Sequence, residues 1–366
     1  MPQFVLDCAK LDEAINKTGF PTEYNVQQKL IAHGWKVISN RYYIDDQKKI
    51  EREIDLLASK NGINLIISCK KSDTEFWTFM TSRNTDVAVP FEYNDGIVQY
   101  FCIEERDVFQ RIAARYPGLA SLLQANDSVR AFQQITKDKF TANNDKHIYD
   151  SIITTIKAAE YEGTSTINFM LSIFEGELVQ KNFDDGQSRT IDEIKYINRH
   201  CIGDNDKYYC VHFIKYDALE SVIDVYDQAV EELPRFIDNL HEEFKADIFT
   251  HPGRIAAFQR PFENDFFDGL YEEVERGNDN FHDLATNPTG IRIYMSHSGK
   301  LHLAFNLFLF SHRAAMASRI NEDDTCRSLM SKSLKKFFGY EGPFVIENDK
   351  EVEEIADRGC PNLRLY

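Results

Sequence analysis

The sequence predicts an α/β fold, because segments typical of strands alternate with a strongly amphipathic helix. Residues 51–72 contain two short apolar runs that flank Asn61-Gly62, a dipeptide typical of the turn between neighbouring strands. Residues 145–162 repeat isoleucine at helical spacing, which predicts a long helix with one buried face. Apolar runs at 168–174 and 208–216 predict two further strands.

The remaining elements follow from the same patterns. Residues 23–33 predict an amphipathic helix, because Pro21 suits a first helical turn and Gly34 suits a helix end. The other expected elements, in chain order, are a helical lead at 1–20, strands near 35–43, 54–57 and 65–70, helical segments within 104–135, strands at 168–174 and 178–183 around a turn at 175–177, strands at 191–201 and 208–216, and a helix at 217–230.

The composition is that of an ordered protein with an acidic surface. The chain has 366 residues, 43% of them hydrophobic, and a formal net charge of −17 at pH 7. Such a charge argues against broad, sequence-independent attraction to nucleic acid, although it permits a local basic groove. The length allows one large domain or two of ordinary size, at about 150 residues per domain.

Cysteine usage and the apolar runs favour an intracellular location. The seven cysteines are scattered and contain no Cys-x-x-Cys pair, which indicates reduced thiols rather than disulfides or a zinc site. The N-terminus has no signal-peptide pattern, and the longest apolar run, 301–310, is about half the length that spans a bilayer. We therefore expect a cytoplasmic protein without a membrane segment.

Acidic residues and one lysine are expected to converge at the ends of two neighbouring strands. Side chains alternate faces along a strand, so Glu53 and Asp55 share one face, and Ser68 and Lys70 share one face of the next strand. Carboxylates hold Mg²⁺, and a nearby lysine stabilises negative charge or orients water during attack on a phosphodiester. The alternative is a surface lysine beside an acid that pairs with another basic side chain.

This arrangement resembles the PD-(D/E)XK nuclease superfamily, and within it the Mrr-like restriction endonucleases. The resemblance rests on Glu23 in the first helix, Gly-Trp-Lys-Val at 34–37, Arg-Glu-Ile-Asp at 52–55 and Cys-Lys-Lys-Ser at 69–72. It implies a restriction-endonuclease-like mixed central sheet flanked by helices, formed by residues 1–230 with an insertion at about 73–144. Residues 231–366 would then form a C-terminal, mostly helical α+β domain of unknown type.

The resemblance also implies an activity and the residues that perform it. Asp55 would bind Mg²⁺ or Mn²⁺, Lys70 would be the catalytic lysine, and Glu23 would be an accessory acid. The main-chain carbonyl of Cys69 would complete the shell of the ion. The expected reaction is hydrolysis of phosphodiester bonds in DNA, duplex DNA rather than RNA, in restriction or phage defence. Cleavage of both strands implies a homodimer.

One position departs from the family's pattern. The family places an acid two residues before the lysine, and this chain has Ser68 there. A hydroxyl lacks the charge of a carboxylate, so a site with Asp55 alone would bind Mg²⁺ weakly. Three interpretations stay open: another acid replaces the missing one, the site has lost catalysis and binds nucleic acid or a partner protein, or Ser68 stands for an altered glutamate. Glu53 is best placed to bind the metal ion with Asp55, because it lies on the same face of the strand; Glu23, Asp73 and Glu75 are further candidates.

Other features receive ordinary interpretations. The aromatic residues between 76 and 101 are expected to pack in a core rather than bind bases, Asp45 and Asp46 to lie in a solvated turn, and His212 to be a satisfied sheet histidine. The basic residues from Arg313 to Lys336 could meet phosphates, but a solvated helix face is favoured. In the same region we expect a strand at 291–295 and a strand or helix from Leu301.

Overall fold

The computed structural model forms two compact units, the first from residues 1–100 and 110–236, the second from residues 101–109 and 237–366. The structure describes residues 6–45, 49–82, 93–94, 112–123, 128–162, 166–202, 205–244, 248–250, 252–286, 288–296, 300–307 and 313–348. Helix α7 (Leu219–Phe244) runs through the domain boundary that we expected at 230 and 231, and continues beyond the helix expected at 217–230.

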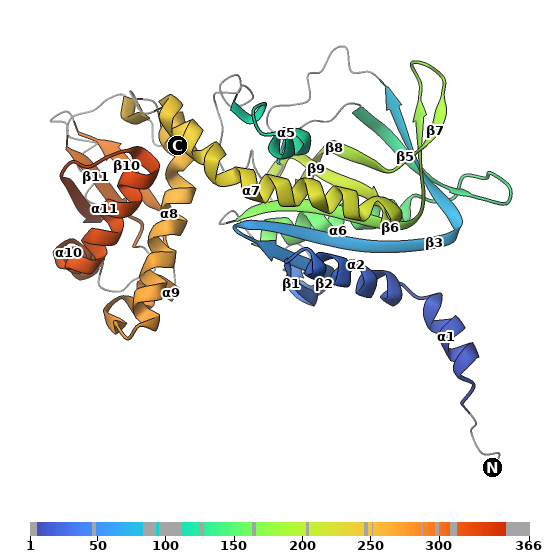
Figure 1. Ribbon diagram of the computed structural model, residues 1–366, viewed down its shortest axis with the longest axis horizontal. Helices are drawn as coiled ribbons and strands as arrows, with labels where there is room; N and C mark the ends of the chain where they lie inside the picture. The colour runs from blue at the N-terminus through green and yellow to red at the C-terminus, as the bar shows by residue number, and fades with distance from the viewer. Residues whose placement is uncertain are drawn as a thin grey trace. The chain divides into compact units, whose positions relative to one another are not determined.

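The first unit is built on a mixed sheet (Figure 1). Neighbouring strands in its main path are β1, β2, β3, β6, β9 and β4; the first three are antiparallel, and β3, β6, β9 and β4 run parallel. Its elements are α1 (Cys8–Asn16), α2 (Phe20–Ala32), β1 (Lys36–Asp45), β2 (Ile50–Lys60), β3 (Ile63–Ser82), β4 (Tyr93–Asn94), α5 (Pro117–Leu123), β5 (Ser128–Thr136), α6 (Lys146–Glu162), β6 (Ile167–Asn182), β7 (Ser188–Ile191), β8 (Glu193–Ile202), β9 (Asn205–Lys215), η1 (Tyr216–Ala218) and the first part of α7.

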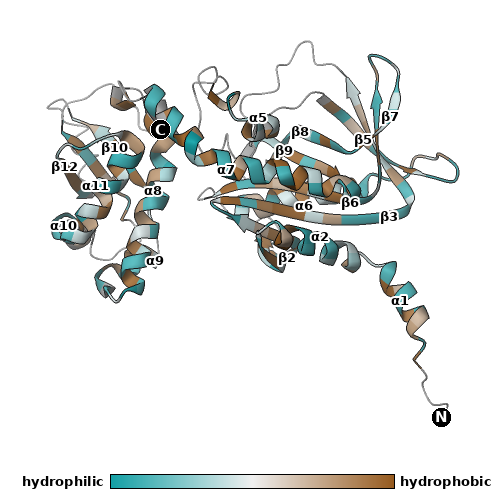
Figure 2. Ribbon diagram, viewed as in Figure 1, coloured by the Kyte–Doolittle hydropathy of each residue, from teal (hydrophilic) through white to brown (hydrophobic). Residues whose placement is uncertain are grey.

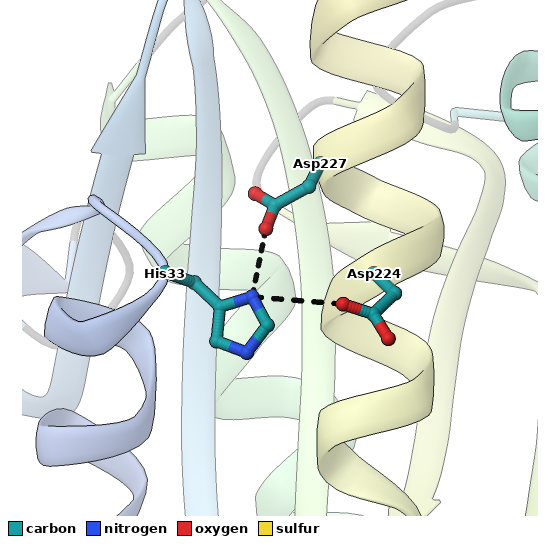
Figure 3. A group of neighbouring side chains, drawn as sticks. All are labelled: His33, Asp224 and Asp227. Atoms are coloured by element: carbon teal, nitrogen blue, oxygen red, sulfur yellow. Dashed lines mark hydrogen bonds and ion pairs between the residues drawn. The ribbon is translucent and has the colours of Figure 1, made fainter.

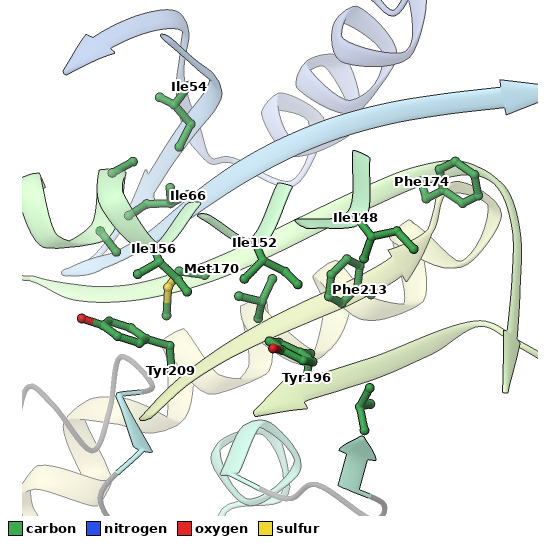
Figure 4. Close-up of a cluster of buried hydrophobic side chains, with 14 of the residues drawn as sticks. Ile54, Ile66, Ile148, Ile152, Ile156, Met170, Phe174, Tyr196, Tyr209 and Phe213 are labelled. Carbon is green, nitrogen blue, oxygen red and sulfur yellow. The ribbon is translucent and has the colours of Figure 1, made fainter. Parts of the chain in front are cut away.

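Helices cover both faces of this sheet, which confirms the coarse α/β class. The connection from β3 to its parallel neighbour β6 contains β4, α5, β5 and finally helix α6, which leads into β6. Its isoleucines, at the spacing that predicted this helix, pack on one face of the sheet in a buried cluster (Figure 4). The members of that cluster include Ile148, Ile152, Ile156, Ile66, Met170, Tyr209 and Phe213. Figure 2 shows the same concentration of apolar residues around α6, β6 and β9.

The opposite face of the sheet meets α2 and α7. Val26 and Leu30 of α2 are completely buried. Tyr226 of α7 lies edge-on against Phe169, with ring centroids 5.2 Å apart, and its hydroxyl lies 3.2 Å from Nδ1 of His212. His212 also contacts Glu193 through Nε2, so the expectation of a satisfied sheet histidine is confirmed.

Three local expectations were wrong. Residues 128–136 form β5 rather than helix, because their backbone pairs with the long continuation of β3. Residues 175–177 do not turn, since β6 is continuous; a Cβ on Gly176 would lie 2.5 Å from the Phe174 ring, so this glycine serves packing. Asp45 is buried rather than solvated, with Lys157 Nζ 2.8 Å from its carboxylate.

Trp77 and Phe79, in the stretch where we expected aromatic core packing, are buried, and Phe76 is partly buried. β3 extends through 73–82, the start of the expected insertion, and Trp77 stacks on Phe174 with centroids 4.0 Å apart. Of the expected aromatic stretch, residues 83–92 and 95–101 lie outside the described residues.

The second unit combines a small sheet with helices. Its elements, after the end of α7, are η2 (Ile248–Thr250), α8 (Pro252–Glu275), η3 (Asp279–Phe281), α9 (His282–Thr286), β10 (Ile291–Met295), β11 (Leu301–Phe305), α10 (Arg313–Glu322), α11 (Asp324–Phe338) and β12 (Phe344–Asn348). The residues from Leu301 therefore form a strand. Two of the basic residues of this region pair with acids: Lys335 with Glu341 and Lys336 with Asp265. None of the described helices is long and apolar enough to cross a membrane.

Candidate functional site

Three elements of the first unit bring Glu23, Asp55 and Lys70 together. α2 begins at Phe20 with a proline in its first turn, and Glu23 follows in that turn. β2 and β3 are antiparallel with Leu56 opposite Ile67, so Asp55 and Ser68 come next on the two strands. The hairpin register therefore sets which side chains meet at this end of the sheet.

Asp55 is held by the neighbouring strand through one of its two oxygens. Oδ2 accepts the backbone N–H of Cys69 at 2.6 Å and lies 3.3 Å from Ser68 Oγ and 3.4 Å from Lys70 Nζ. Within the part of the chain that the structure describes, no donor contacts Oδ1. The sheet thus fixes the orientation of Asp55 and leaves one oxygen to face a ligand.

Glu23 lies in the electrostatic field of the same group. Its pKa is raised, first by burial and then by the negative charge of Asp55; Lys70 opposes this and Glu53 adds to it. No described residue donates a hydrogen bond to its carboxylate. A side chain placed on Gly19 would come within 3.3 Å of Glu23 Oε1, so the carboxylate folds back toward the start of α2. Two carboxylates therefore share a half-buried site with one ammonium group.

Lys70 is the cation of this site. Its Nζ donates to the main-chain oxygen of Cys69 at 3.1 Å, and its side chain is 31% exposed beside Asp55, which is 22% exposed. The Cys69 thiol is buried and its pKa is raised well above the ordinary value, chiefly by burial, so it stays protonated. Cys69 contributes through its main chain, whose N–H and carbonyl both contact the site.

Ser68 sits inside the fold rather than at the opening of the site. Its side chain is 1% exposed, and its neighbour across the parallel strand pair is Ser172, whose hydroxyl accepts from Ser151 of α6 at 2.6 Å. Small hydroxyl side chains therefore fill the space beneath Asp55.

The other acids considered for the missing carboxylate differ in what they contact. Glu53 is exposed and accepts a hydrogen bond from Asn40. Asp73 is exposed on the continuation of β3. Glu75 accepts from Gln134 at 2.8 Å and from Asn143 at 2.6 Å, so both its oxygens are used. Glu23 is the one of the four that combines partial burial, the field of Asp55 and an oxygen pair without a donor in the described chain.

Glu175, which sequence reasoning missed, lies close by but is occupied. One of its oxygens accepts from Lys71 at 2.6 Å and the other from the hydroxyl of Thr22. Burial opposes ionisation, but these hydrogen bonds hold the pKa of Glu175 below its ordinary value. Strand alternation predicts that Lys71 and Lys70 point to opposite faces. The sequence around Lys71 does not indicate that its partner lies on a strand about 100 residues later.

A second polar cluster lies at the other end of α2 (Figure 3). Nδ1 of His33 is 2.8 Å from Asp227 and 3.7 Å from Asp224, both on α7. The second oxygen of Asp227 accepts from Trp35 Nε1 at 2.8 Å and Lys60 Nζ at 2.7 Å. The three residues have donor types that could hold a metal ion, but Asp227 already has a cation and two N–H groups around it.

Comparisons with known proteins add no relative: no family model matches the sequence, and neither a curated protein nor a solved structure matches it.

Proposed function

We propose that this protein is a Mg²⁺- or Mn²⁺-dependent endonuclease that hydrolyses phosphodiester bonds of DNA. The observation that carries the proposal is the meeting of Glu23, Asp55 and Lys70 from three separate elements, with two carboxylates whose free oxygens have no donor among the described residues. Hard divalent cations prefer such oxygens. The proposal is further supported by the order α2, β1, β2, β3, with α6 leading into β6 parallel to β3, which is compatible with the fold that the resemblance implies; β4, α5 and β5 lie between β3 and α6.

The roles follow from the contacts. Asp55 Oδ1 and Glu23 would hold the ion, and the Cys69 carbonyl is available beside them once Lys70 turns toward a substrate. A bound Mg²⁺ supplies Lewis-acid stabilisation of the phosphoryl oxygens. Lys70 orients the attacking water and stabilises the charge that develops on phosphorus oxygens. Glu23 supplies the carboxylate that the family places at the position of Ser68. The restriction or phage-defence setting and a homodimer are part of the same proposal.

A second candidate function is a catalytically inactive module that binds nucleic acid or a partner protein. The observation that favours it is Ser68, which is buried and contacts Asp55 where the family has a carboxylate. In that case the site keeps its shape without enough negative charge to retain an ion.

The two candidates differ in cleavage. Supercoiled plasmid, linear duplex, single-stranded DNA and RNA are incubated with the protein and Mg²⁺ or Mn²⁺, alongside Asp55→Ala, Lys70→Ala, Glu23→Gln and Ser68→Glu. Cleavage by the original chain that is lost in the first three variants supports the endonuclease. Cleavage by Ser68→Glu alone supports the inactive module, and no cleavage by any variant contradicts the nuclease proposal.

A further inference from the structure

The loop at 137–145, between β5 and α6, is a well-anchored projection beside the strand that carries Lys70. The N–H of Lys137 donates to Thr74 O of β3 at 2.8 Å, and the N–H of Asn143 donates to Gln134 O at 2.8 Å. Thr74 is four residues beyond Lys70. Figure 1 shows the loop extending outward next to the bend of β3.

Phe140, in this loop, combines a left-handed backbone with an exposed side chain. Its φ is +50°, in the left-handed region that a bulky side chain rarely adopts, and its side chain is 76% exposed. Its one ring contact with another described residue is an edge-on approach to Phe76, with centroids 5.7 Å apart. The Phe140 N–H donates to Thr136 O and the Thr136 N–H donates to Thr141 O, both at 3.0 Å, so a hydrogen-bonded turn presents this exposed ring.

Three lysines surround Phe140 on this projection. Lys137, Lys139 and Lys146 are all exposed, and none forms an ion pair within the described part of the chain. Lys71 and Lys215, on the adjacent strands, each pair with a glutamate. The segment 137–146 holds three lysines against two aspartates, in a chain with a formal net charge of −17. Exposed cations that bracket an exposed aromatic ring are typical of a surface that binds phosphates and a base.

We propose that the loop 137–145, together with Lys146, is a nucleic-acid-binding arm of the candidate site. Lys137 and Lys139 contact phosphates of the strand that extends from Asp55 and Lys70 along β3, and Phe140 stacks on an unstacked base of that strand. This inference rests on the proposed function for its substrate, but it concerns binding and needs no cleavage. It also answers how so acidic a protein would hold DNA: a local basic arm replaces a basic surface.

The test is equilibrium binding of the full chain to fluorescent single-stranded and duplex DNA, in EDTA, over a range of salt concentrations. Each phosphate contact contributes about 0.9 to the slope of log affinity against log salt for duplex DNA. The Lys137→Ala/Lys139→Ala variant is expected to lower that slope by about 1.8. Phe140→Ala is expected to weaken binding about tenfold, a typical loss for one base stack, and more for single strands than for duplex.

Two controls keep the result interpretable. Phe183→Ala removes a phenylalanine that is also exposed, 63%, in the turn after β6, and Lys332→Ala removes an exposed lysine of α11; both are expected to bind like the original chain. Phe140→Asn places a residue that tolerates positive φ, so its thermal midpoint should equal or exceed that of the original chain while binding weakens.

Each outcome decides the inference. Loop variants that bind like the original chain, or an original chain that binds no nucleic acid of either kind, overturn it. If the loop variants bind normally while Asp55-dependent cleavage persists, the arm is wrong and the proposed nuclease stands. If the loop governs binding and no variant cleaves, the arm stands and the nuclease is wrong.

Discussion

The two ends of helix α2 carry acidic clusters of similar composition and different chemistry. At its start, Glu23 and Asp55 share one ammonium group from Lys70, and one oxygen of Asp55 has no donor in the described chain. At its end, Asp227 has donors from Lys60, Trp35 and His33. The number of acidic residues therefore does not predict which cluster binds a ligand. The clusters differ in how many hydrogen-bond donors and cations of the fold already contact each carboxylate, which we call its compensation.

This difference assigns the clusters different roles. A compensated carboxylate ties its own helix, here α7, to the elements that donate to it, here the end of α2 and β2, and it gains little from an added cation. Burial, and then the negative charge of Asp55, raise the pKa of Glu23, so ionising both carboxylates is costly, and a divalent cation would lower that cost. The cluster at the end of α2 holds the fold, and the cluster at its start is available for a ligand.

The largest expected effect is a loss of DNA cleavage when the cluster at the start of α2 is altered. Lys70→Ala should lower the rate of plasmid cleavage at least about 10²-fold, a loss typical of removing one group that stabilises transition-state charge. Lys60→Ala, which removes the cation of the other cluster, should leave the rate per folded molecule unchanged. Equal losses in both variants would erase the distinction between the clusters. Initial rates at saturating Mg²⁺ make the measurement.

The next effect is on stability, and it should belong to the cluster at the end of α2. Asp227→Ala leaves the Trp35 N–H without its acceptor and Lys60 with only the main-chain oxygen of His33, so the free energy of unfolding in urea should fall by about 2–4 kcal/mol. Asp224→Asn is the matched control on the same helix; its side chain is 72% exposed, so the change should stay within about 0.5 kcal/mol. A fall of similar size in both would show that Asp227 is not a structural centre.

A smaller effect, with opposite signs for stability and function, is expected at Glu23. Its raised pKa means that the folded state holds the proton more tightly than the unfolded state, so stability is lost as pH rises from the ordinary value of 4.5 through the folded pKa. Glu23→Gln should therefore be more stable than the original chain at pH 7 and equal to it below pH 4.5. Urea unfolding across this range would show the difference, and a variant less stable at pH 7 would contradict it.

The sequence predicted the local parts of both the fold and the site. Asn61-Gly62 and the apolar runs around it located the hairpin, and the isoleucine repeat located α6, because turn chemistry and helical periodicity are local. The positions of Asp55, Ser68 and Lys70 followed from strand alternation alone. These residues do meet in the structure, although their catalytic roles stay a proposal.

Long-range pairing was beyond that reasoning. Gly176 suggested a turn but packs against Phe174. The apolar spacing of 128–136 is compatible with a helix, but this segment pairs with β3 as a strand. Asp227 and Glu175 find their donors on elements more than 100 residues away, and their sequence neighbours carry no trace of this. Which donors contact a given carboxylate is decided only when the sheet and helices have assembled.

The most direct test is a calorimetric Mn²⁺ titration of the full chain, Asp55→Asn and Asp224→Asn. We expect the original chain and Asp224→Asn to bind the ion with the same affinity and Asp55→Asn to lose that binding, with a matching loss of the stabilisation that bound metal gives to unfolding. Binding that survives in Asp55→Asn and disappears in Asp224→Asn would move the metal site to the other end of α2 and contradict the account.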